Sequence, residues 1–129
     1  MPDMIFYKFA QSRAGSKILT WCLSHCSFLL PIKRLAENDQ LIAFHHPRPS
    51  YPVHILLIPK KVITGIDELT KKDRGLLLEV MKTAQTLVNK MNLNQTGYRL
   101  VLNAGAYQEV PQLHFHLILA ESTNCTKEH

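Results

Sequence analysis

The sequence predicts an α+β fold, in which an antiparallel sheet of about five short strands packs with one long helix and an N-terminal helix. Short apolar runs, separated by polar or proline-rich turns, recur along the chain as they do in strands joined by hairpins. One long segment instead repeats its apolar residues at helical spacing. The 129 residues, of which 46% are hydrophobic and 19% charged, are enough for one globular domain with an ordinary core.

The two ends of the chain differ from the part between them. Residues 1–34 are interpreted as a helical extension of the same domain, because apolar residues recur at helical spacing from about Arg13 to Leu29 and Pro31 ends the run. This stretch is short for a membrane span and carries polar residues, so we expect no membrane segment. An odd number of cysteines without a recognisable signal peptide favours free thiols and a cytoplasmic location. Residues 121–129 are predicted to form a polar tail.

The main domain is predicted to span residues 35–120, and its first strands follow in order. An edge strand is predicted at Lys33–Leu35 and a short strand at Leu41–Phe44, with a polar turn between them. Three prolines in six residues predict a stiff, extended loop over residues 45–52. The next run, Val53–Ile58, is almost continuously apolar, which is typical of a central, buried strand.

The longest helix is predicted at Ile66–Met91. Thr64 and Thr70 are both possible N-terminal caps, and acidic residues lie near the expected start. Residues Asn92–Gly97 are predicted to end the helix. The predicted apolar stripe consists of Leu76, Leu77, Val80, Ala84, Leu87, Val88 and Met91.

Two strands are predicted after the helix, at Tyr98–Leu102 and Gln112–Leu119. Because successive strand residues point to opposite faces, Gln112, His114 and His116 are expected to share one face of the second strand. Neighbours on that face lie about 6–7 Å apart, so two imidazoles can touch one phosphate group.

The loop between these strands starts with Asn103 and Gly105. Glycine permits a tight backbone course beside a ligand, and such a loop can direct backbone N–H groups at an anion. Taken alone, Asn-x-Gly is typical of a hairpin turn. Next to the two histidines, the combination favours a phosphate site.

The order of these motifs resembles that of the histidine triad family. Asn103-x-Gly105, followed by Gln108-x-Val110-x-Gln112-x-His114-x-His116, resembles the family signature His-φ-His-φ-His-φ-φ, with Gln112 at the first histidine. The segment 41–46, followed by 52–61, is similar to the family's upstream strand pair, in which a histidine precedes Ile-Pro-Lys. The resemblance covers roughly residues 35–120.

The resemblance implies a nucleotide hydrolase or transferase that acts on dinucleotides, nucleotidyl amidates or related phosphoanhydrides. It makes His114 the nucleophile that attacks the α-phosphorus, and it places His116 and His54 near the phosphate. Neutral imidazole has a lone pair for this attack, and its other nitrogen needs an acceptor, expected to be a backbone carbonyl. Gln112 can hydrogen-bond there but cannot titrate. The other implied site residues are Asn103, Gly105, Gln108, Glu109 and Val110 for the phosphate, and Phe44 and His46 for the nucleoside.

The expected partner is a nucleotide or a related phosphorylated small molecule, with no cofactor and no metal, and the resemblance implies a homodimer. The net charge of +5 attracts anions, but the basic residues are too scattered to indicate a nucleic-acid polymer. Two alternatives stay open. The protein could bind a nucleotide without turnover, or it could bind a metal through His54, His114 and His116.

Overall fold

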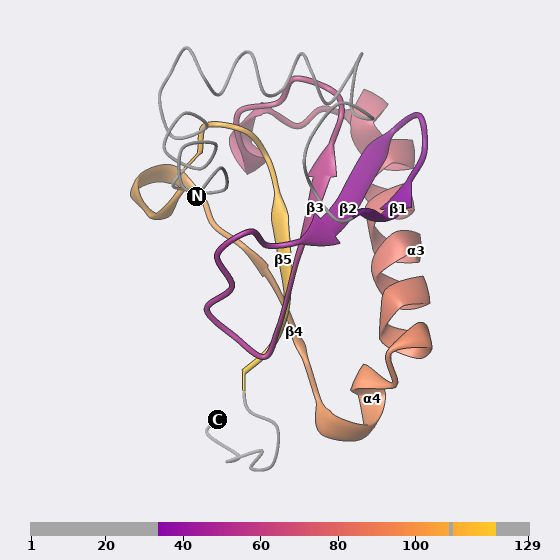
Figure 1. Ribbon diagram of the computed structural model, residues 1–129. Helices are drawn as coiled ribbons and strands as arrows, with labels where there is room; N and C mark the ends of the chain where they lie inside the picture. Colours follow the sequence, from indigo (N-terminus) through magenta and orange to yellow (C-terminus); the bar gives the residue numbers. More distant parts are fainter. Residues whose placement is uncertain (1–33, 109, 121–129) are drawn as a thin grey trace.

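The computed structural model describes residues 34–108 and 110–120. The predicted N-terminal helix, Glu109 and the polar tail lie outside these residues. The described chain forms a five-stranded antiparallel sheet in the order β1-β2-β3-β5-β4, with one long helix beside it (Figure 1). The predicted sheet and long helix are therefore confirmed. The strands are β1 (Arg34–Glu37), β2 (Leu41–His45), β3 (Val53–Pro59), β4 (Arg99–Leu102) and β5 (Phe115–Leu119).

The strand β3 is the central strand, as its apolar sequence predicts. It pairs with β2 on one side and with β5 on the other, and every residue from His54 to Pro59 is buried. A strand that is covered on both faces needs apolar side chains in both directions, which explains the continuous apolar run. The buried His54 is the exception.

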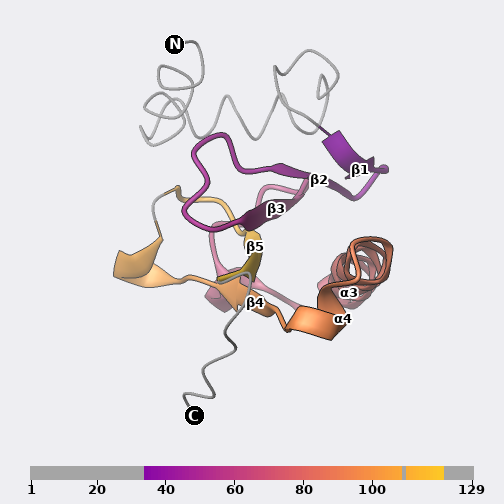
Figure 2. The same cartoon turned by 60° about the horizontal axis from the view of Figure 1, so that its bottom comes forward.

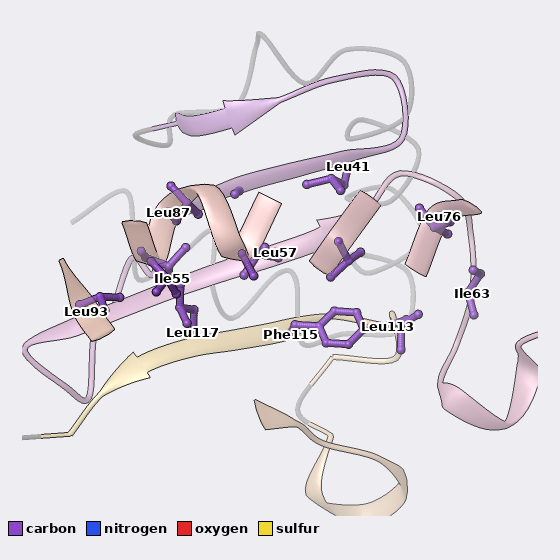
Figure 3. Packing of buried hydrophobic residues seen from close by; sticks show 14 residues of the cluster. Leu41, Ile55, Leu57, Ile63, Leu76, Leu87, Leu93, Leu113, Phe115 and Leu117 are labelled. Atoms are coloured by element: carbon purple, nitrogen blue, oxygen red, sulfur yellow. The ribbon is translucent and has the colours of Figure 1, made fainter. Parts of the chain in front are cut away.

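Two apolar clusters lie on opposite faces of the sheet. Side chains such as Ile55, Leu57 and Leu117 pack toward the long helix and form the main core (Figure 3). Figure 2 shows the helix to one side of the sheet. The second, smaller cluster on the other face consists of Ile42, Phe44, Leu56 and Ile58.

The long helix, α3, spans Arg74–Lys90 and not Ile66–Met91, so the predicted start is wrong. Leu69 is extended (ψ 141°) and so is Thr70 (ψ 174°), and these residues separate two short 3₁₀ turns, η2 (Ile66–Glu68) and η3 (Lys71–Asp73). The apolar periodicity upstream does not reveal this break. The predicted apolar stripe is confirmed: five of its residues are buried, and Leu77 and Met91 pack partly buried against the core.

A capping box fixes where the helical region begins. The Thr70 hydroxyl accepts the N–H of Lys72, and the Asp73 carboxylate accepts the N–H of Thr70 (2.9 Å). The Lys61 ammonium donates to the same carboxylate (2.5 Å) and, together with the Thr70 bond, holds the pKa of Asp73 below its usual value. Of the two predicted caps, Thr70 caps η3, the turn that leads into α3, whereas α3 itself begins after Asp73 without a side-chain cap bond.

The last strand also starts later than predicted, at Phe115 rather than Gln112. The backbone N–H of Gln112 donates to the Val110 carbonyl (2.8 Å), and that of Leu113 donates to the Ile63 carbonyl (2.7 Å). These bonds draw the start of the segment away from the strand ladder. In the part of the chain that the structure describes, no helix is long and apolar enough to span a membrane.

Candidate active site

The two central strands bring His54 and His116 together. His54 pairs with Ile118 across β3 and β5, and Leu56 pairs with His116, so both histidines project from the same face of the sheet. Their ring centroids are 5.1 Å apart, and Nε2 of His54 lies 2.8 Å from Nδ1 of His116. The sequence predicts both residues near a phosphate but not this hydrogen bond.

The proton positions in this histidine pair follow from its neighbours. The backbone N–H of Ser50 donates to Nδ1 of His54 (3.1 Å), so this nitrogen is an acceptor. A neutral His54 then carries its proton on Nε2 and donates it to Nδ1 of His116. His116 in turn carries its proton on Nε2. The ring proton of His116 therefore lies on the nitrogen that does not face His54.

A hydrogen bond to a backbone carbonyl fixes the tautomer of His114. Its Nδ1 lies 2.6 Å from the backbone oxygen of Gln112, and a carbonyl oxygen can only accept. Nδ1 thus carries the proton and Nε2 the lone pair. The side chain is 8% exposed, and its ring lies edge-on to that of His116, with the centroids 4.9 Å apart. The expected backbone acceptor is confirmed.

His46 joins the same group of rings. It stacks on His54 with a centroid distance of 4.3 Å, and its Nδ1 accepts the backbone N–H of Arg48 (2.9 Å). The ring of Tyr51 lies edge-on to that of His54, with the centroids 5.3 Å apart. The proline-rich loop therefore folds back over the histidine pair. Its backbone contribution through Ser50 has no sequence signal, since every residue except proline has an N–H group.

Gln112 does not belong to the strand that carries His116, which corrects the predicted alternation. Its side chain is 3% exposed and bonds to backbone groups at the end of β3 and in the segment that follows it. The amide nitrogen donates to the carbonyls of Pro59 (3.2 Å) and Lys61 (3.0 Å), and the amide oxygen accepts the N–H of Ile63 (3.3 Å). Gln112 therefore contributes its backbone carbonyl to the candidate site, while its side chain hydrogen-bonds to the backbone of residues 59–63.

The predicted phosphate loop lies next to His114. Leu102 pairs with Phe115, so the next residue, Asn103, lies beside His114 and is half-buried. Gly105 has φ +59°, the left-handed region that glycine favours, and it starts the short turn η4 (Gly105–Tyr107). The expected tight backbone course is confirmed.

The remaining predicted site residues have different surroundings. The Gln108 amide donates to the carbonyls of Thr64 (2.7 Å) and Gln112 (3.2 Å), so its side chain anchors the loop. Val110 is half-buried, and its carbonyl accepts the N–H of Gln112. Phe44 is 4% exposed in the second apolar cluster, on the face that carries His116.

The donor set does not favour the metal-binding alternative. Both nitrogens of His54 are engaged, one with the Ser50 N–H and the other with His116. Among residues 34–108 and 110–120, no group of three or more His, Cys, Asp or Glu side chains is arranged to hold a metal ion. The proposed three-imidazole ligand set therefore lacks the geometry that it needs.

A family model described as the HIT domain matches residues 30–123. The chain belongs to the HIT domain family. This confirms the histidine triad resemblance at the level of the family.

The similarity to several relatives extends over most of this chain and most of theirs. The chain is 36% identical over 91 residues to an uncharacterized HIT-like protein from Synechococcus elongatus, covering 69% of this chain and 79% of that protein. Among solved structures, a HIT family hydrolase from Legionella pneumophila is 30% identical with a TM-score of 0.71, covering 82% of this chain and 96% of that one. A histidine triad protein from Clostridium difficile is 25% identical with a TM-score of 0.72, covering 83% and 92%.

Proposed function

We propose that this HIT domain hydrolyses or transfers a nucleotidyl group through a covalent intermediate on His114. The observation that carries the proposal is the bond between Nδ1 of His114 and the Gln112 carbonyl, because it leaves the lone pair on Nε2. Two solved relatives, from L. pneumophila and from Clostridium thermocellum (27% identical, TM-score 0.72), are HIT family hydrolases. The proposed substrates are nucleoside phosphoramidates, dinucleotides and other nucleotidyl anhydrides.

The first step forms a bond between Nε2 of His114 and the α-phosphorus, and the bond from phosphorus to the leaving group breaks. The leaving group takes the bonding electron pair. The ring of His114 then carries a positive charge, and its Nδ1–H stays on the Gln112 carbonyl. The developing charge on the phosphoryl oxygens is stabilised by the Nε2–H of His116 and the amide of Asn103.

The second step returns the enzyme to its starting state. Water attacks the phosphorus, the P–N bond breaks, and the electron pair returns to Nε2 of His114. The nucleotide leaves with the hydroxyl oxygen and one proton passes to solvent. Another hydroxyl acceptor in place of water gives transfer instead of hydrolysis.

Mass spectrometry of the intermediate tests the proposal. The full chain is mixed with adenosine 5′-phosphoramidate or a diadenosine polyphosphate and quenched in denaturant at neutral pH, because phosphohistidine bonds break in acid. We expect one peptide to gain the mass of a nucleoside monophosphate at His114, and His114→Asn to lose both the adduct and turnover. The matched control His45→Asn, at the exposed end of β2, keeps both.

Two outcomes contradict the proposal. Turnover with an adduct on another residue, or unchanged turnover in His114→Asn, excludes His114 as the nucleophile. Nucleotide affinity with neither adduct nor turnover in the unsubstituted protein leaves a binding module as the function.

A further inference from the structure

The amide nitrogen and the amide oxygen of the Gln112 side chain are both hydrogen-bonded to the backbone. A glutamine amide has two N–H donors and a carbonyl acceptor. Here the donors reach the carbonyls of Pro59 and Lys61, and the acceptor receives the N–H of Ile63. At 3% exposure, these bonds have little competition from water.

The backbone carbonyl of the same residue is held from two directions. It accepts Nδ1–H of His114 at 2.6 Å and the side-chain amide of Gln108 at 3.2 Å. The Gln108 amide also donates to the Thr64 carbonyl at 2.7 Å. Both glutamines therefore tie this carbonyl to one stretch of chain, residues 59–64, which begins at the last residue of the strand carrying His54.

We infer that Gln112 is a positioning residue, whose side chain holds its own carbonyl where it sets the His114 tautomer, and that glutamine serves this purpose better than histidine. A neutral imidazole has one donor and one acceptor. Histidine at this position leaves at least one of the backbone groups of Pro59, Lys61 and Ile63 without its partner. A buried polar group without a partner is destabilising, so the segment and the carbonyl shift.

The test measures the tautomer of His114 directly. Long-range ¹H–¹⁵N correlation spectra of the full chain distinguish a protonated from an unprotonated ring nitrogen, and His114→Asn identifies the signals. We expect Nδ1 of His114 to be protonated in the unsubstituted protein and a mixture of tautomers in Gln112→His. The control Gln85→His, on the exposed side of α3, adds a histidine without touching this network and leaves the spectrum of His114 unchanged.

The rate gives a second readout, which rests on the proposed function. Small displacements of reacting groups cost up to about 100-fold in rate, so we expect Gln112→His to lower turnover by at least about tenfold. Gln112→His with an unchanged tautomer, or with turnover equal to or above that of the unsubstituted protein, overturns the inference. The NMR readout needs no substrate, so its outcome is independent of whether His114 is the nucleophile.

A second variant, Gln108→Met, tests the same inference if Gln112→His does not fold. Gln108 is half-buried, so Gln108→Met removes one tie to the carbonyl without disturbing the core. We expect a smaller shift of the His114 tautomer in the same direction. A tautomer identical to that of the unsubstituted protein overturns the inference.

Discussion

The hydrogen bond between His54 and His116 can be measured as a coupling free energy. Phenylalanine at either position keeps a ring for the contacts with His46 and His114 but removes the nitrogens that form the 2.8 Å bond. His54→Phe also loses the Ser50 bond, but it does so in both backgrounds, so this loss cancels in a double-mutant cycle. One neutral hydrogen bond contributes about 0.5–1.5 kcal/mol, and we expect a coupling of that size.

Urea unfolding of the unsubstituted protein, the two single variants and the double variant gives the four free energies of the cycle. The control combines His116→Phe with His45→Phe. His45 is exposed at the end of β2, and the alternation of side chains along β2 places it on the face of the sheet opposite His116. The effects of these two substitutions on the free energy of unfolding are expected to add within about 0.5 kcal/mol. Additive effects of His54→Phe and His116→Phe would refute a stabilising hydrogen bond between the two histidines.

Two further predictions concern stability. Because the pKa of Asp73 is lowered, its contribution to the stability of the fold is complete above the ordinary carboxyl pKa of 3.8 and is lost as the pH falls below it. The Tm difference between the unsubstituted protein and Asp73→Asn is therefore expected to narrow below that pH. A Tm difference that stays constant in thermal scans across this pH range contradicts the expectation. Gly105→Ala, at φ +59°, is expected to cost about 1–2 kcal/mol in urea unfolding. Gly75→Ala, in α3, where the added methyl group meets no heavy atom within 4 Å apart from its chain neighbours and its own helix backbone, gains about 0.5–1 kcal/mol. Equal changes in the free energy of unfolding for the two substitutions contradict this expectation.

The sheet could be predicted because burial determines its strand patterns. A short, continuous apolar run such as Val53–Ile58, bounded by prolines, is typical of a strand covered on both faces, and the structure places it at the centre. The helix start could not be predicted from apolar spacing, because Ile66 and Leu69 continue the spacing through two short turns. The capping box of Thr70 and Asp73 starts the η3 turn that leads into α3, and it depends on local hydrogen bonds rather than on burial.

The histidines that the structure brings together were predictable, and so was the backbone acceptor of His114, but the other hydrogen bonds of the candidate site were not. The alternation along the last strand indicates His114 and His116, and the family resemblance adds a role for His54. The bond between His54 and His116 depends on the register of β3 and β5, which no pattern along the chain specifies. The partners of Gln112 are backbone groups, which nearly all residue types share, so the sequence contains no signal for them.

The strand order has a consequence for how the site comes into existence during synthesis. The first three strands pair in the order in which a ribosome releases them, whereas β4 has only β5 as its neighbour in the sheet. When β5 inserts between β3 and β4, it completes two hydrogen-bond ladders and brings His116 to His54 in the same event. A nascent chain that stops before Phe115 therefore holds His54 without His116, and the hydrogen-bonded pair cannot form.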